Sequence, residues 1–223
     1  MAKKKLAMTG PDLFSANDPK KLFLLDGMAL IYRAHFGMIR SPRFTSGEVP
    51  TSAVFGIANT VFDLIKKQSP THIAIAFDTS EPTFRHQVYE EYKAQRDSLP
   101  EDIATQIPMV DQLMGALNIP VIRTPGFEAD DIIGTLAIEA AAADYEVFMV
   151  TPDKDYHQLV TPQIKVYKPG HRGGAFELLD VAAVLENWQV ERVDQVVDSL
   201  VCWGTKATTF PASRGSAKRR PSS

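Results

Sequence analysis

The sequence predicts an α/β domain in three layers, with a mostly parallel central sheet and helices on both of its faces. Short apolar runs, typical of buried strands, alternate along the chain with longer segments of helical periodicity. Parallel strands need a crossover connection, usually a helix, so this alternation favours a parallel sheet. The composition, with 44% hydrophobic and 23% charged residues, is that of an ordinary globular protein.

The predicted elements lie between residues 21 and 200, which we interpret as one domain. Neither an internal repeat nor a linker interrupts this region. The predicted strands are residues 22–25, 73–77, 121–122 and 147–150, and the predicted helices are residues 51–67, 101–117 and 128–143.

The N-terminal residues 1–20 are expected to form a flexible polar arm. Three lysines follow Met1-Ala2, but Thr9-Gly10-Pro11-Asp12 stands where a signal peptide would be apolar. No run approaches the roughly 18 apolar residues of a membrane helix, so no membrane partner is expected. The single cysteine, Cys202, allows no intrachain disulfide and suits a reducing cytoplasm.

Three apolar runs are followed by aspartates. Asp26 and Asp78 each come directly after a predicted strand, and Asp153 and Asp155 follow a third. In an open parallel sheet, ligands bind outside the carboxyl ends of the strands. These four carboxylates are therefore expected to gather at one edge of the sheet.

A further acidic group, Glu128-Ala129-Asp130-Asp131, precedes a predicted helix. Acids at this position favour a helix N-terminus, so helix capping alone is an open alternative. The functional interpretation rests on the number of carboxylates expected at this edge, because crowded carboxylates repel one another unless cations bind. Oxygen ligands without His or Cys indicate Mg²⁺ or Mn²⁺, and phosphodiester hydrolysis is the reaction class that uses such metals. The full candidate set is Asp26, Asp78, Glu128, Asp130, Asp131, Asp153 and Asp155.

A basic and aromatic stretch spans residues 83–96. Its side chains recur at spacings of three and four, which predicts that most of them share one helical face. One interpretation is a solvated charged helix with half-buried tyrosines. The other is a phosphate-gripping segment whose tyrosines stack on bases. The residues concerned are Arg85, Tyr89, Tyr92, Lys93 and Arg96.

Taken together, these motifs resemble the 5′-nuclease domain of bacterial DNA polymerase I, in the flap-endonuclease group. The order and spacing hold from about residue 22 to residue 200, and Pro152 replaces a glycine that is common in the family. The matching motifs are Leu24-Leu25-Asp26-Gly27, Tyr32-Arg33-Ala34, Ala76-Phe77-Asp78, Thr83-Phe84-Arg85 with Tyr92-Lys93 and Arg96, Glu128 to Ala137, and Asp153-Lys154-Asp155 with Gln158-Leu159-Val160.

The resemblance implies a resolvase-like, PIN-like fold and two metal sites. Asp26, Asp78, Glu128, Asp130 and Asp131 would hold the first metal, and Asp153 and Asp155 would lie nearer the second. Residues 80–100 would form an arch that passes a 5′ single strand, with Tyr32, Arg33, Arg85, Tyr92, Lys93 and Arg96 on the DNA. Substrates would be 5′ flaps, nicked or branched duplexes and RNA primers in replication and repair, and a polymerase domain would follow in the intact gene product.

The resemblance stops at Leu200. The family continues with Gly-Asp-x-Ser-Asp-Asn, which completes the second metal site, and then a glycine-rich turn that opens a helix–turn–helix element. Residues 201–223 carry five basic residues and no acid, consistent with a disordered basic tail. Read one base earlier, however, the codons of residues 204–209 permit Gly-Asp-Lys-Ser-Asp-Asn. We therefore expect an out-of-frame tail, a missing helix–turn–helix element and weak or absent cleavage.

The sequence leaves three alternative functions to compare with a nuclease. A non-catalytic DNA-binding fragment of the same domain would retard DNA without cutting it. A ribonuclease of the related toxin-like group has a similar acidic edge, but those domains are shorter and lack the pattern of residues 83–96. A scaffold role leaves the acidic cluster unexplained.

Overall fold

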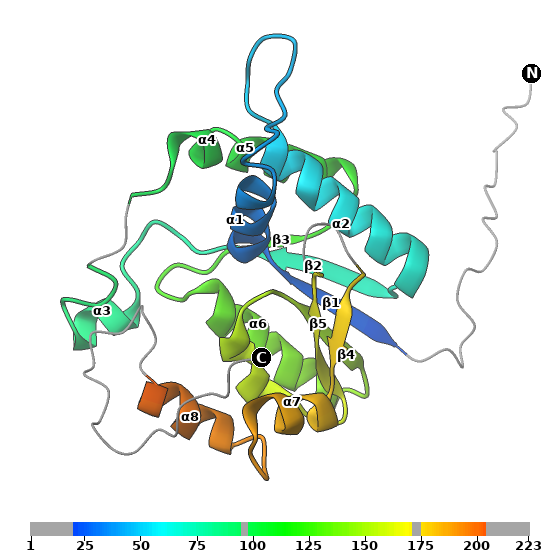
Figure 1. The fold of residues 1–223 in the computed structure, drawn as a ribbon, viewed down its shortest axis with the longest axis vertical. Helices are drawn as coiled ribbons and strands as arrows, with labels where there is room; N and C mark the ends of the chain where they lie inside the picture. Colours follow the sequence, from blue (N-terminus) through cyan, green and yellow to red (C-terminus); the bar gives the residue numbers. More distant parts are fainter. Residues whose placement is uncertain (1–19, 95–97, 171–174, 204–223) are drawn as a thin grey trace, which may run out of the picture.

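The computed structural model describes residues 20–94, 98–170 and 175–203, and its centre is a six-stranded sheet of order β3-β2-β1-β4-β5-β6 (Figure 1). All neighbouring strands pair in parallel except β5 and β6, which are antiparallel. This confirms the predicted mostly parallel α/β class. The strands are β1 (Lys21–Asp26), β2 (His72–Ala76), β3 (Val121–Ile122), β4 (Glu146–Val150), β5 (Ile164–Lys168) and β6 (Glu177–Leu179).

Helices cover both faces of the sheet, so the fold has three layers (Figure 1). One face carries α1 (Gly27–Gly37), α2 (Ser52–Gln68), α4 (Glu101–Ala104) and α5 (Ile107–Ala116). The other carries α6 (Ala129–Ala142), α7 (Val181–Trp188) and α8 (Gln195–Trp203). Two short helices lie near the carboxyl ends of the strands, α3 (Phe84–Val88) and η1 (Lys154–Leu159). No helix in the described part of the chain has the length and apolar character needed to cross a bilayer.

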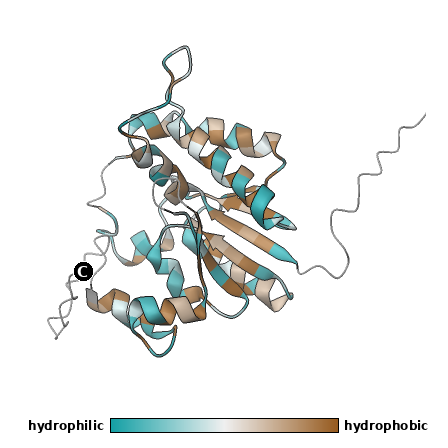
Figure 2. Ribbon diagram, turned by 45° about the vertical axis from the view of Figure 1, so that its right-hand side comes forward, coloured by the Kyte–Doolittle hydropathy of each residue, from teal (hydrophilic) through white to brown (hydrophobic). Residues whose placement is uncertain are grey.

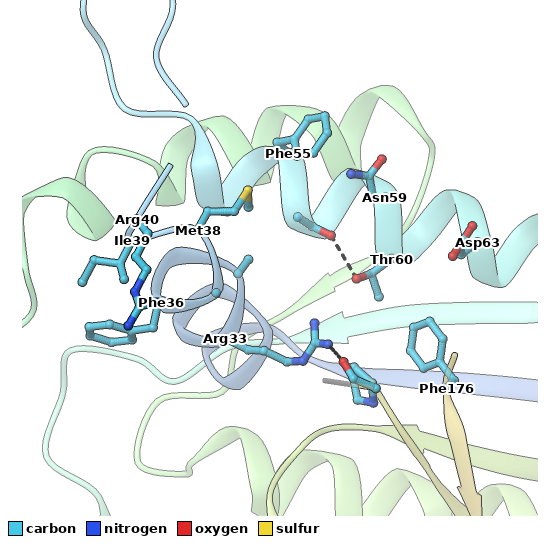
Figure 3. A pocket seen from close by; sticks show the side chains of 15 residues that line it. Arg33, Phe36, Met38, Ile39, Arg40, Phe55, Asn59, Thr60, Asp63 and Phe176 are labelled. Carbon is cyan, nitrogen blue, oxygen red and sulfur yellow. Dashed lines mark hydrogen bonds between the residues drawn. The ribbon is translucent and has the colours of Figure 1, made fainter. Parts of the chain in front are cut away.

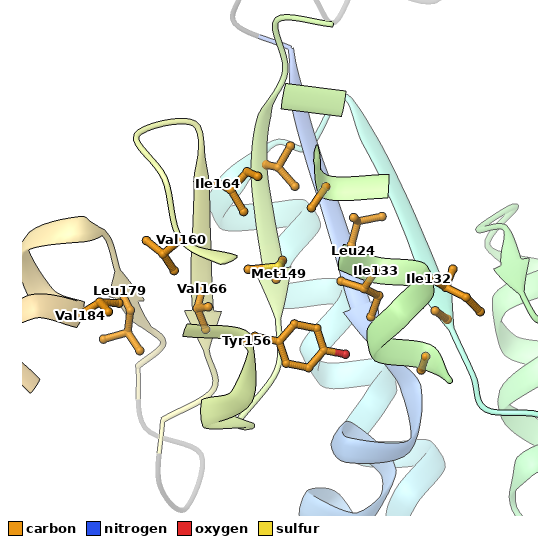
Figure 4. Close-up of a cluster of buried hydrophobic side chains, with 14 of the residues drawn as sticks. Leu24, Ile132, Ile133, Met149, Tyr156, Val160, Ile164, Val166, Leu179 and Val184 are labelled. Carbon is orange, nitrogen blue, oxygen red and sulfur yellow. The ribbon is translucent and has the colours of Figure 1, made fainter. Parts of the chain in front are cut away.

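Strand β1 supplies the core of both layers because its side chains alternate between the two faces. Phe23 and Leu25 pack with α1, α2 and α5, whereas Leu24 packs with α6 on the other side. The ring of Phe23 stacks on its strand partner Phe148 at 4.5 Å between centroids. Figure 2 shows the strands as apolar along most of their length, and Figure 4 shows the cluster around Leu24 on the α6 face.

One predicted helix is divided in two. Residues 101–117 were expected to be continuous, but the structure separates α4 from α5 at Thr105 and Gln106. Pro108 accounts for the break, because its ring would clash with the carbonyl of Ala104 in an unbroken helix. The expected helices at residues 51–67 and 128–143 are confirmed as α2 and α6.

The break places a buried side chain at the start of α2. Thr51, the residue before α2, makes no side-chain capping bond. Instead, Gln106 accepts a hydrogen bond from the backbone N–H of Ala53 at 2.7 Å, and its amide nitrogen donates to the carbonyl of Asp102 at 2.7 Å. Gln106 is fully buried, so it satisfies an N–H group of α2 that water cannot reach.

We therefore expect Gln106→Ala to lower the free energy of unfolding by about 1–3 kcal/mol, because a buried N–H loses its partner. Urea unfolding followed by circular dichroism measures this. Thr105→Ala is the matched control, since the Thr105 hydroxyl is exposed and bonds only the Glu101 carbonyl of its own turn. Equal unfolding midpoints for the two variants would contradict the capping role of Gln106.

Candidate active site

The aspartates that follow the strands lie at one edge of the sheet, as the sequence predicted. β1 lies between β2 and β4 and is parallel to both, so all three strands end on the same side. Asp26 is the last residue of β1, Asp78 follows the end of β2, and Asp153 follows the end of β4. The N-terminus of α6, which carries Glu128 to Asp131, reaches the same edge through a bond to Asp78.

Asp26 is the buried centre of this edge, with 7% of its surface exposed. Its Oδ1 accepts a hydrogen bond from the N–H of Ala29 at 3.1 Å, which caps α1. Its Oδ2 accepts bonds from the hydroxyls of Thr151 and Tyr156, both at 3.1 Å. Burial raises the pKa of Asp26 to about 6 in spite of these donors, and the negative charge of Asp78 adds to the rise.

Thr151 and Tyr156 were not singled out from the sequence. Both are almost completely buried, and they connect the segment after β4 to the end of β1. Figure 4 shows Tyr156 among the apolar side chains of the α6 face, with its hydroxyl at the rim of that cluster. The only sequence signal was that these residues flank Asp153-Lys154-Asp155.

The carboxylates near α6 do cap that helix. Asp78 accepts from the N–H of Ala129 at 2.6 Å, and Asp131 accepts from the N–H of Glu128 at 3.0 Å. Asp130 accepts from the N–H of Asp131 at 2.8 Å. These carboxylates therefore do cap the start of α6, as the capping interpretation expected. Capping leaves other oxygens of the same side chains for further partners.

Basic side chains of residues 83–94 contact two of these carboxylates. Arg85 makes a bidentate pair with Asp131, at 2.7 and 2.8 Å. Lys93 Nζ lies 2.6 Å from Glu128, and the Tyr92 hydroxyl donates to Glu128 at 3.1 Å. Glu128 has only 5% of its surface exposed, so these partners neutralise a buried charge.

Residues 83–94 do not form the single helix expected over residues 83–96. Helix α3 ends at Val88, and Lys93 has a left-handed backbone with φ of 57°. The turn brings Arg85, Tyr92 and Lys93 together on Glu128 and Asp131, which a continuous helix with a solvated face would not do. Arg96 lies outside the described residues.

The acidic groups of α6 differ in their tendency to hold a proton. Removal of water, followed by the charges of Asp131 and Glu128, raises the pKa of Asp130 to about 6. Partial burial acts in the same direction on Asp131, but the bonds from Arg85 and from the N–H of Glu128 outweigh it and lower the pKa of Asp131. Asp131 is thus held as an anion by Arg85.

Asp153 and Asp155 occupy the turn that begins η1. Asp153 is exposed and accepts from the N–H of Asp155 at 3.0 Å. Asp155 is half-buried, and its Oδ1 is shielded from solvent without a hydrogen-bond partner. Burial and the charge of Asp153 raise the pKa of Asp155. An unsatisfied carboxylate oxygen of this kind suits a cation ligand.

Tyr32 and Arg33, predicted to contact DNA, lie on α1 beside this turn. Arg33 donates to the carbonyl of Gly170, and the Tyr32 ring lies parallel to Phe36. With Asp153 they line a cavity of about 390 Å³. A larger cavity of about 1110 Å³ runs between α1, α2 and the turn near Gly170, but none of the seven candidate carboxylates lines it (Figure 3).

The donor set fits a hard divalent cation, because every candidate ligand is a carboxylate. The candidate carboxylates are not arranged as a complete set of metal ligands. Among the residues that the structure describes, no three His, Cys, Asp or Glu side chains are placed so as to hold a metal ion. Two of the seven carboxylates, Glu128 and Asp131, are instead paired with the protein's own cations.

This combination of a parallel α/β sheet and an acidic carboxyl edge is that of a nuclease domain. Residues 21–189 match the family model of the 5′-3′ exonuclease N-terminal, resolvase-like domain. The chain belongs to this family, as its motifs indicated.

Two curated relatives show how the chain compares with whole proteins. It is 45% identical to DNA polymerase I of Mycobacterium tuberculosis over 157 residues, which cover 70% of this chain and 17% of that protein. It is 33% identical to a 5′-3′ exonuclease of Aquifex aeolicus over 196 residues, which cover 88% of this chain and 65% of the relative. The chain thus spans about a fifth of the length of the polymerase relatives it matches.

Solved structures share the fold. The T5 5′-exonuclease with bound zinc ions superposes with a TM-score of 0.68 at 18% identity, covering 87% of this chain and 70% of that one. The bacteriophage T5 flap endonuclease in a complex with DNA and metal ions gives a TM-score of 0.67 at 20% identity, covering 88% and 71%. At this identity the likeness establishes the resolvase-like architecture.

The contacts of Asp26 predict a pH-dependent effect of Tyr156→Phe. Above pH 6 Asp26 is charged, and removal of the hydroxyl donor should lower the free energy of unfolding by about 2 kcal/mol. Near pH 5 Asp26 is largely protonated, and the same substitution should lower the free energy of unfolding by about 1 kcal/mol. Linkage gives the direction in which the stability of the wild type changes with pH. The pKa of Asp26 is about 6 in the folded protein and 3.8 ordinarily, so burial of Asp26 lowers the free energy of unfolding as the pH rises from about 3.8 to about 6.

Denaturant unfolding of wild type and variant at pH 5 and pH 8 measures this difference. Tyr167→Phe is the control, because the Tyr167 hydroxyl bonds Gln68 on the other face of the sheet. If the cost of Tyr156→Phe does not grow with pH, the hydroxyl does not support the Asp26 anion.

Proposed function

We propose that this chain is a divalent-metal-dependent 5′-3′ exonuclease and flap endonuclease domain that hydrolyses phosphodiester bonds of DNA. The observation that carries the proposal is the gathering of acidic side chains at the carboxyl edge of the sheet, beside basic side chains, in a member of the 5′-3′ exonuclease family. Relatives named DNA polymerase I and 5′-3′ exonuclease support it.

The carboxylates would serve as ligands of Mg²⁺ or Mn²⁺. We assign Asp26, Asp78, Glu128, Asp130 and Asp131 to a first site and Asp153 and Asp155 to the neighbourhood of a second. A bound cation would supply positive charge against the phosphate oxygens at which negative charge develops. The buried donors on Asp26 orient it toward this edge.

The basic residues would handle the DNA. Arg85 and Lys93 carry fixed positive charges beside the carboxylates, where they would orient and neutralise phosphates. The rings of Tyr32 and Tyr92 and the guanidinium of Arg33 would contact the DNA strand. Arg96 is assigned to DNA binding by the same resemblance. We propose 5′ flaps, nicked or branched duplexes and RNA primers as substrates, and a role in cytoplasmic replication and repair together with a polymerase domain, as in the relatives named DNA polymerase I.

Residues 201–223 bear on the second metal site. We propose that the codons of this segment are read here in a shifted frame, so that residues 204–209 stand where the family has the two second-site aspartates. Residues 204–223 lie outside the described part of the chain. Sequencing of the gene across codons 195–225 tests the shifted frame. If the frame is shifted, the codons used for residues 204–209 spell Gly-Asp-Lys-Ser-Asp-Asn when they are read one base earlier.

A single-turnover assay on a 5′-flap substrate, with protein in excess, tests the nuclease proposal. We expect slow cleavage that requires Mg²⁺ and stops with EDTA. Asp130→Asn should reduce the rate by at least about 100-fold, because it removes a candidate ligand whose hydrogen bond is a local one to the N–H of Asp131, so the change acts on ligation rather than folding.

Asp111→Asn is the matched control, since Asp111 pairs with Arg123 and none of the candidate ligands. Gel retardation of the flap substrate without Mg²⁺-dependent cleavage would instead favour a non-catalytic DNA-binding domain.

A further inference from the structure

His157 and Trp188 form a buried polar pair that links η1 to α7. Both side chains are almost completely buried, with 7% and 8% of their surface exposed. The indole Nε1–H of Trp188 donates a hydrogen bond to Nδ1 of His157 at 2.8 Å, and the two rings meet edge to face at 5.9 Å between centroids. Neither residue is a candidate ligand or a predicted DNA contact.

The bond between the two side chains fixes the protonation of the histidine ring. An indole nitrogen can only donate, so Nδ1 of His157 carries no proton and the ring is neutral, with its hydrogen on Nε2. Burial lowers the pKa of His157 to about 4, which agrees with a neutral ring at physiological pH. Donor and acceptor therefore satisfy each other in a place largely shielded from water, and removal of either leaves a buried polar group without this partner.

The pair lies on one side of the short helix η1. A 3₁₀ helix has three residues per turn, so Lys154 and His157 project from the same side. Both contact the Trp188 ring, since the ammonium of Lys154 lies 5.9 Å from its centroid. Tyr156 projects from another side and bonds Asp26. Two directional bonds thus hold η1 between α7 and the end of β1.

Asp155 gives this hold a consequence for the site. Its Oδ1 is shielded from solvent, and no group in the described part of the chain donates a hydrogen bond to it. This carboxylate oxygen would gain hydrogen bonds to water if η1 turned outward. The apolar contacts of Tyr156 and Leu159 do not by themselves prevent such a turn, because apolar packing is not directional. The hydrogen bonds to α7 and β1 are directional and oppose it.

We propose that His157 and Trp188 are positioning residues, whose mutual bond fixes the rotation of η1 about its axis. Asp153 and Asp155, at the start of η1, are thereby kept at the carboxyl edge of the sheet. Neither His157 nor Trp188 touches metal or DNA in this role, because each acts through the turn. The inference rests on the proposed function, since it takes the two aspartates to be groups that the reaction uses.

The alternative is that the pair only fills the space between η1 and α7. The two accounts predict opposite orders for two variants of His157. Leucine has about the volume of histidine but no acceptor, whereas asparagine is smaller and places an amide oxygen near the position of Nδ1. If packing decides, His157→Leu is the milder change. If the bond decides, His157→Asn is the milder change.

The first experiment measures amide hydrogen exchange of residues 153–160 in the full chain. His157→Leu and Trp188→Phe should each raise exchange there about tenfold, the effect of losing one net hydrogen bond, whereas His157→Asn should stay within about threefold of the wild type. The double variant of His157→Leu with Trp188→Phe should be no worse than either single variant, because both remove the same bond.

Tyr167→Phe is the matched control for this experiment. It breaks a side-chain bond of the same 2.8 Å length, to Gln68 on the other face of the sheet, and should leave exchange of residues 153–160 unchanged.

The second experiment measures how the turn affects metal. Mn²⁺ binding, followed by electron paramagnetic resonance of the free ion, and the Mg²⁺ concentration for half-maximal flap cleavage should both shift about tenfold toward weaker binding in His157→Leu and Trp188→Phe, as is typical when residues that orient metal ligands are changed. His157→Asn and Tyr167→Phe should resemble the wild type. Both quantities are measured where circular dichroism shows every variant to be folded, so a loss of stability alone moves neither.

The outcomes separate the pair from the nuclease function. A milder effect of His157→Leu than of His157→Asn on exchange overturns the bond as the hold on η1. Unchanged metal binding in variants whose η1 exchanges faster overturns the positioning role and leaves the nuclease function standing. If the wild type binds Mn²⁺ without cleavage, the Mn²⁺ values decide. A wild type that neither binds Mn²⁺ nor cleaves overturns the nuclease proposal, and the positioning role with it.

Discussion

The parallel pairing of β1 with β2 on one side and β4 on the other is the constraint on which the site depends. Neighbouring parallel strands end at the same edge of the sheet, so the aspartates that follow them lie close together without long connecting loops. The same pairing places β1 inside the sheet, where helices bury both of its faces, through Phe23 and Leu25 on one side and Leu24 on the other. The strand that anchors the core therefore also carries Asp26 to the site.

Burial and hydrogen bonding act in opposite directions on this edge. Burial favours the protonated form of Asp26, whereas the donors from Ala29, Thr151 and Tyr156 favour the anion. On α6, Arg85 and Lys93 compensate Asp131 and Glu128 directly. The protein thus stabilises a concentration of negative charge partly with fixed hydroxyl and backbone donors and partly with cations on a short, separately attached segment.

Family membership and geometry contribute different things. The family match and the relatives identify a nuclease domain, and the solved structures establish its architecture. The geometry adds that two of the candidate ligands are paired internally, and that Asp155 retains a shielded oxygen without a partner. A motif comparison reports which residues are present, but it does not report which of their atoms are engaged.

The sequence by itself determined the α/β class, the buried strands, helices α2 and α6, and the positions of the acidic residues, because apolar periodicity and strand-end aspartates are local features. It also indicated that Arg85, Tyr92 and Lys93 belong together. It could not show the break at Gln106, the turn after Val88 or the donors on Asp26. Those features were decided by contacts between residues far apart in the chain: Gln106 meets α2, Lys93 meets Glu128, and Tyr156 meets Asp26 only when the layers are packed around the sheet.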